Sequence, residues 1–187
     1  MKYFKPELLT RYRSCNDDEA ASAAKEWDEA IAAYESRLQT IFPRLPREVQ
    51  RLCSEFSLHD AQLFGVARKN TPPTICTWLR LDESSAEQAR ILELNYTPVT
   101  GLAGGIEIDP RDIATASPEN QVFVLYDEVD RDETQGFLTH SLLLSNGREL
   151  DIRFTDLAIE IFDDGMTPSA LFAEKKKWTF ETASTSQ

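Results

Sequence analysis

Residues 136–154 read GFLTHSLLLSNGRELDIRF, and this stretch decides the fold. Two segments in it alternate apolar and polar residues with a period of two, as half-buried strands do. The side chains that share one face are Leu138, His140, Leu142 and Leu144 in the first arm, and Leu150, Ile152 and Phe154 in the second. The pattern predicts a β-hairpin.

The length of the turn follows from matching the two apolar faces. A two-residue Asn146-Gly147 turn would set Leu142 opposite Asp151. A three-residue Ser145-Asn146-Gly147 loop, with Gly147 in the left-handed conformation, sets Leu142 opposite Leu150 and His140 opposite Ile152. We therefore predict the three-residue loop with a bulge.

The first third of the chain has a helical pattern. Asn16 or Asp17 can cap a helix that ends before Pro43. This helix carries one narrow apolar stripe at spacings of four, three, four and three, formed by Trp27, Ile31, Tyr34, Leu38 and Ile41. A second helix is predicted from about Pro46 to Phe56, and the two should form a helical hairpin. The stripe could serve as a dimer seam, but packing on a sheet is favoured because it spans few heptads.

Extended segments follow from His59 onwards. Strands are predicted over residues 63–68, 75–81 and 91–99, with a short piece at 106–108. Val122–Tyr126 is apolar on both faces, which predicts a central strand. The apolar phase changes near Thr155-Asp156, so either a bulge or a new strand begins there.

These elements predict an α+β protein that forms one globular unit. An N-terminal helical segment, residues 1–57, should pack on a mainly antiparallel, meander-like sheet of about six strands within residues 58–181. Residues 182–187 are expected to be a disordered tail.

The charge narrows the class of partner. The formal net charge is -12, which disfavours nucleic acid and anionic membranes because their phosphates would be repelled. A basic protein is the natural counterpart, although acidity for solubility alone is the competing explanation.

The opening residues lack the apolar core of a signal peptide, and there is no run of about 18 apolar residues. The three cysteines are odd in number and form no Cys-x-x-Cys pair, which indicates reduced thiols in a cytoplasmic protein and disfavours a metal–thiolate site. No cofactor is predicted.

His59 and Asp60 are the first candidate site residues. Such a pair occurs in metal-dependent phosphohydrolases, but His140 is the only other histidine available to build a metal site. Asp60 or His59 can instead cap the transition from helix to strand. The sharper alternative is that His59 and His140 meet across the sheet as acid/base groups or metal ligands. A packed histidine on the apolar strand face is the other interpretation of His140.

The acidic run of residues 127–133 is the second candidate. Asp130 and Asp132 fit the opening of a calcium-binding EF-hand loop, but Gln135 replaces its glycine and Ser141 its bidentate glutamate. A solvated hairpin loop that contacts a cationic partner is simpler. Its proposed contact residues are Asp127, Glu128, Asp130, Asp132 and Glu133. Gly101, Gly104 and Gly105 lack a phosphate-binding motif, and no serine lies in a Gly-x-Ser-x-Gly turn.

Three segments carry a resemblance to known proteins. The opening Met1-Lys-Tyr-Phe-Lys-Pro-Glu-Leu8, the helix with Trp27 and Tyr34, and Leu58-His-Asp-Ala61 together resemble an uncharacterised bacterial family. The His-Asp start, the run of strands and the closing Leu-x-Ile-x-Phe also look like immunity proteins of bacterial toxin systems. The first resemblance supplies no catalytic residues, and likeness of fold does not establish function.

Taken with the charge and the failed motifs, these observations favour a non-catalytic interaction module that binds a basic protein. The alternative is a small metal-dependent or acid/base hydrolase using His59, Asp60 and His140. A structural homo-oligomer seated on the Trp27 to Ile41 stripe is the third possibility.

Overall fold

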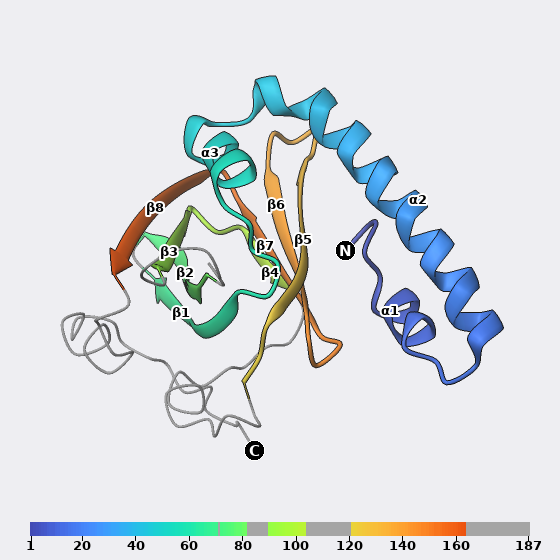
Figure 1. Ribbon diagram of the computed structural model, residues 1–187. Coiled ribbons are helices and arrows are strands. Elements are labelled where there is room, and N and C mark those ends of the chain that lie inside the picture. Colours follow the sequence, from blue (N-terminus) through green and yellow to red (C-terminus); the bar gives the residue numbers. More distant parts are fainter. Residues whose placement is uncertain (71, 82–89, 104–120, 164–187) are drawn as a thin grey trace, which may run out of the picture.

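The computed structural model describes residues 1–70, 72–81, 90–103 and 121–163 (Figure 1). The helices are α1 (Pro6–Tyr12), α2 (Asp17–Ile41) and α3 (Arg47–Glu55), with a 3-10 turn η1 (Phe42–Arg44). The strands are β1 (Gln62–Asn70), β2 (Pro73–Arg80), β3 (Arg90–Thr97), β4 (Gly101–Ala103), β5 (Val124–Arg131), β6 (Leu138–Leu144), β7 (Glu149–Phe154) and β8 (Asp156–Asp163). The expected piece at 106–108 and the tail at 182–187 lie outside the described residues. None of the described helices has the length and hydrophobicity needed to cross a membrane.

The strands form two antiparallel sheets, with orders β1-β2-β3-β8 and β4-β7-β6-β5. The α+β class is confirmed, but the prediction of a single meander-like sheet is wrong. The physical reason lies at Thr155, where β7 ends in one sheet and β8 begins in the other. The change of apolar phase near Thr155-Asp156 therefore marks a new strand that pairs with β3, and the two sheets close over a shared core.

The hairpin is confirmed in its register and its loop. Leu142 lies opposite Leu150 and His140 opposite Ile152. The loop spans Ser145 to Gly147: the Gly147 N–H donates to the carbonyl of Leu144 at 2.8 Å, and Gly147 has a φ of +79°. Glycine adopts this left-handed conformation without the steric cost that a Cβ atom brings. The apolar face of both arms consequently lies in the core between the sheets.

Helix α2 begins with the expected side-chain cap, since Asn16 Oδ1 accepts from the backbone N–H groups of Asp18 at 3.0 Å and Glu19 at 3.3 Å. It packs along α1 and reaches β5, whereas α3 packs on β8 (Figure 1). The expected hairpin of the two longer helices is therefore replaced by the pair α1 and α2. The physical reason is aromatic packing: Trp27 of α2 contacts Tyr12 of α1, and also packs with Phe4 and with Tyr126 of β5 on the outer face of the second sheet.

Strand β5 is the last strand of its sheet, which corrects the expectation of a central strand. The segment 122–124 at its start is nevertheless hydrogen-bonded on the outer side to residues 60–63. Both of its faces are covered all the same: Val124 lies in the core between the sheets, and Tyr126 lies under the N-terminal segment. Its outer edge is also protected, since the Val129 N–H donates to the hydroxyl of Tyr34 at 2.8 Å. The doubly apolar pattern of this segment thus reflects helices packed on an edge strand.

Candidate functional site

The buried His140 lies at the centre of a row of three hydrogen-bonded polar side chains. Its side chain is fully buried between the sheets, and its two ring nitrogens have partners from different strands. The hydroxyl of Tyr96, on β3 of the other sheet, lies 2.8 Å from Nδ1, and Asp127 Oδ2, on β5, lies 3.3 Å from Nε2. Tyr96, His140 and Asp127 therefore join the two sheets through one imidazole.

The hydrogen bonds of Tyr96, His140 and Asp127 serve the fold. Burial raises the pKa of the Tyr96 hydroxyl, which keeps the proton needed for donation to Nδ1. The neutral imidazole can then donate its Nε2–H to the Asp127 carboxylate, so both ring nitrogens are satisfied. No ring nitrogen remains for a substrate or a metal ion, and the interpretation of His140 as a packed histidine fits this geometry.

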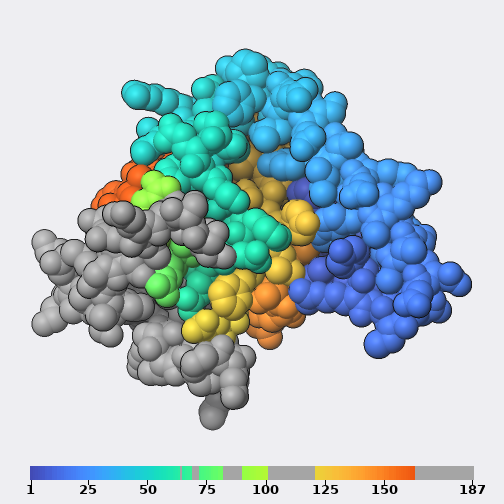
Figure 2. Space-filling view, viewed as in Figure 1, coloured from blue at the N-terminus to red at the C-terminus, as the bar shows by residue number. Residues whose placement is uncertain are grey.

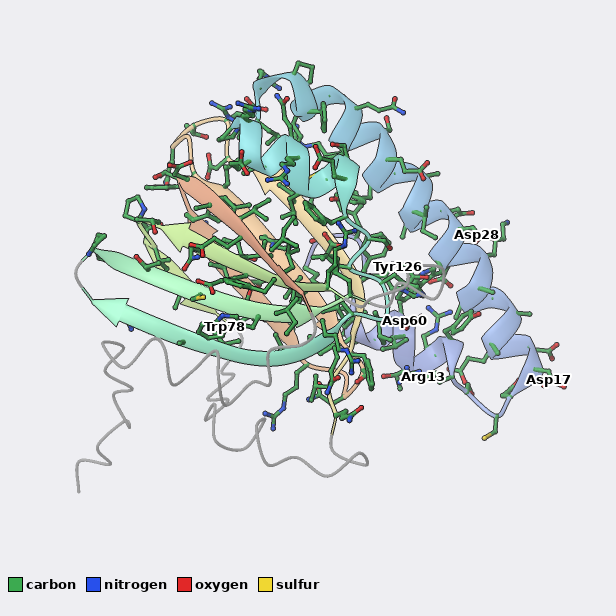
Figure 3. All side chains as sticks on the ribbon, turned by 60° about the vertical axis from the view of Figure 1, so that its left-hand side comes forward. Arg13, Asp17, Asp28, Asp60, Trp78 and Tyr126 are labelled. Atoms are coloured by element: carbon green, nitrogen blue, oxygen red, sulfur yellow. The ribbon has the colours of Figure 1, made fainter. Side chains whose placement is uncertain are left out.

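His59 and Asp60 lie at the surface, on the turn before β1. Their side chains are 53% and 56% exposed, and His59 Nε2 lies 3.5 Å from Asp60 Oδ2. His59 Nδ1 is hydrogen-bonded to the carbonyl of Leu125, and the ring packs against Tyr126 with centroids 5.3 Å apart. Figure 3 shows Asp60 beside Tyr126 at the boundary between the sheet and the N-terminal helices.

The structure does not bring the two histidines together. His59 is bonded to Leu125, whereas His140 lies opposite Val129, four residues further along β5. The His59 ring packs against Tyr126, whose side chain lies on the outer face of the second sheet, whereas the His140 ring lies on the inner face. His140 also points into the core, while His59 is exposed. A single acid/base or metal site made of His59, Asp60 and His140 has no support in this geometry.

The first acidic residues of the run 127–133 are paired within the chain. Asp127 faces His140, and the buried Glu128 accepts from the backbone N–H groups of Lys2 and Tyr3. Asp130 Oδ1 lies 2.7 Å from a guanidinium nitrogen of Arg37 on α2. These carboxylates attach β5 to the N-terminal segment and to α2.

The end of the run serves the turn between β5 and β6. Asp132 Oδ1 accepts from the backbone N–H groups of Thr134 at 2.8 Å and Gln135 at 3.0 Å, which lowers the pKa of its carboxyl. Glu133 pairs with Arg44 at 2.7 Å. The five residues expected to contact a partner are thus engaged in internal contacts.

A second acidic surface, which the sequence reasoning missed, lies on α2. This surface, called the α2 acidic flank below, consists of the exposed carboxylates of Asp17, Asp18, Asp28, Glu29 and Glu35. Asp17, Asp28 and Glu35 are separated by eleven and seven residues, spacings that return to one side of a helix. Helix α1 occupies the opposite flank, where Arg11 pairs with Glu26 at 2.7 Å. The eleven- and seven-residue spacing was the available sequence signal.

The α2 acidic flank is open to solvent over most of the helix. Figure 2 shows α2 along one side of the molecule, and Figure 3 shows Asp17 and Asp28 on it, away from the sheets. In the part of the chain that the structure describes, no ion pair involves Asp17, Asp28 or Glu35. Among the described residues, Glu29 forms an ion pair with the exposed Lys25 alone, whose Nζ lies 3.9 Å from Glu29 Oε1.

Two further observations limit the chemistry of the described residues. Burial, aided by the charge of Asp127, raises the pKa of the Cys53 thiol to about 12, so Cys53 is a poor nucleophile at neutral pH. No group of three or more His, Cys, Asp or Glu side chains within the described ranges is arranged to hold a metal ion.

Comparison with known proteins leaves the family open. No protein-family model matches the chain, and no curated protein matches it.

Proposed function

We propose that this protein is a non-catalytic interaction module and that the α2 acidic flank binds a basic protein partner. The observation that carries the proposal is the contrast between the two acidic regions. The run 127–133 is engaged by the chain's own cations and N–H groups, whereas Asp17, Asp28 and Glu35 face solvent on a 25-residue helix.

The scaffold under this flank suits recognition. Trp27 and Ile41 of α2 are buried, so the helix is held in place before a partner arrives. A preorganised surface loses less conformational entropy on binding. Ala21 and Ala32 lie among the carboxylates of the flank and let a partner approach the helix closely.

The sign of the charge selects the partner. A net charge of -12 attracts cationic proteins at long range, and complementary charge raises association rates and suppresses wrong partners. An immunity-like role, with a basic toxin surface as the partner, is one form of this function.

The proposal is tested with a triple charge reversal, Asp17→Lys, Asp28→Lys and Glu35→Lys. Partners are captured from a lysate of the source organism, identified by mass spectrometry, purified and titrated against both forms of the protein. A basic partner should bind the variant at least about tenfold more weakly, because several complementary charges are reversed together.

A matched variant controls for net charge. Glu48→Lys, Glu55→Lys and Glu160→Lys make the same change of charge on α3 and β8. Binding of the partner to this control should stay within about twofold of the original protein. Equal loss in both variants, or no loss in the α2 variant, would remove the α2 acidic flank from the proposed function.

A further inference from the structure

Independently of the proposed partner, the geometry points to His59 Nε2 and Asp60 Oδ2 as two ligands for one divalent transition-metal ion of the Zn²⁺ class. The two atoms are 3.5 Å apart. Two ligand atoms at about 2.0–2.1 Å from a tetrahedral ion are about 3.4 Å apart. The observed separation fits that spacing, and it is longer than the roughly 2.7–3.2 Å of an N–H···O hydrogen bond.

The imidazole is oriented for this role by its other nitrogen. His59 Nδ1 is hydrogen-bonded to the carbonyl of Leu125, which can only accept. Nδ1 therefore carries the proton, and the lone pair of the neutral ring resides on Nε2. Metal-binding histidines are held in the same way, with the second ring nitrogen donating to a carbonyl or carboxylate.

The carboxylate and the access to it are also suitable. Asp60 has a φ of +62°, and its backbone N–H donates to the carbonyl of Val124 at 2.8 Å, which holds the turn. The Tyr126 ring supports His59 from one side, with centroids 5.3 Å apart. Both ligand side chains are more than half exposed, so the remaining coordination positions are open to water or to a donor from a ligand.

The donor set defines the class of ion. One imidazole nitrogen and one carboxylate oxygen suit Zn²⁺, Ni²⁺ and Cu²⁺, with Cu²⁺ bound most tightly in the Irving–Williams order. His140 cannot compete, because Tyr96 and Asp127 occupy both of its ring nitrogens in the core. The ion would lie at the surface with two protein ligands, so its affinity is expected to be lower than that of a closed structural site with four protein ligands.

The test titrates the full chain with ZnCl₂ by calorimetry and with Cu²⁺ by electron paramagnetic resonance. We expect one ion per chain and a Cu²⁺ spectrum with hyperfine coupling from a single imidazole. His59→Gln should weaken Zn²⁺ binding at least about tenfold, because it removes the nitrogen ligand.

A second variant separates metal binding from the structure of the turn. Asp60→Gly should weaken Zn²⁺ binding at least about tenfold while the urea midpoint stays equal or rises, because glycine adopts a φ of +62° without strain. Glu7→Gln, at an exposed carboxylate of α1, should leave Zn²⁺ affinity unchanged. Absence of binding to the original protein, or unchanged affinity in His59→Gln and Asp60→Gly, would overturn the inference. Neither result bears on the α2 acidic flank.

Discussion

The two histidines show how burial assigns different roles to one side chain. His140 is fully buried, and both of its ring nitrogens are used to join the sheets. His59 is half exposed and uses only Nδ1 for the fold, so Nε2 is left for a ligand. The apolar neighbours of His140 in the sequence indicated its packing, while its bond to Tyr96 depends on the second sheet.

Three titratable groups, one buried and two partly buried, predict a loss of stability at alkaline pH. Burial raises the pKa values of Tyr34, Tyr96 and Cys53 above their ordinary values of 10, 10 and 9. Their neutral forms are favoured in the folded state, so this stabilisation is complete below pH 9. It is lost as the pH rises through 9 to 12 and beyond, by up to about 1.4 kcal/mol per pH unit for each group.

Urea unfolding between pH 8 and pH 11, followed by tryptophan fluorescence, measures this loss. The ionisation of Tyr34 and Tyr96, followed by absorbance at 295 nm, should coincide with unfolding. A free energy of unfolding that is constant from pH 8 to pH 11 would contradict the prediction.

At the scale of elements, the acidic run 127–133 joins β5 and its turn to the N-terminal helices. Arg37 of α2 contacts both Asp130 and the backbone carbonyl of Arg131, and Arg44 of η1 reaches Glu133. The run was expected to meet an external cation. The cations come instead from the same chain, at sequence distances that no local pattern reveals.

A double-mutant cycle on Arg37→Gln and Asp130→Asn tests this attachment. We expect a coupling energy of about 1 kcal/mol, since the two side chains are only 24% and 30% exposed and make a close contact. The same cycle on the exposed pair Lys25 and Glu29 should give at most about 0.5 kcal/mol. If urea unfolding gives equal coupling energies for the two pairs, the Arg37–Asp130 contact stabilises the fold no more than an exposed ion pair does, which contradicts the prediction.

For the whole molecule, the arrangement of helices predicts a monomer. The stripe that could have formed a dimer seam is used internally, since Trp27 is 6% exposed and Ile41 is fully buried. Light scattering in moderate salt should therefore give a mass near 21.2 kDa. A mass twice as large would show that another surface supports self-association and would return the homo-oligomer to consideration.

The sequence by itself determined the features that depend on near neighbours. The period-two faces of residues 138–154 and the conformational freedom of Gly147 set the hairpin register. The stripe from Trp27 to Ile41 and the cap at Asn16 determined α2. Each of these features depends on steric limits of the backbone or on contacts between residues a few positions apart.

Only the tertiary structure decided how these elements combine. It divided the strands into two sheets and placed β5 at the end of one of them. It also brought Tyr96 to His140 and paired the carboxylates of residues 127–133 with Arg37 and Arg44. Residues 44 to 93 positions apart meet in these contacts. Such pairings depend on the packing of the whole core and on the entropy of closing long loops. The local period of apolar residues in the sequence gives no information about either quantity.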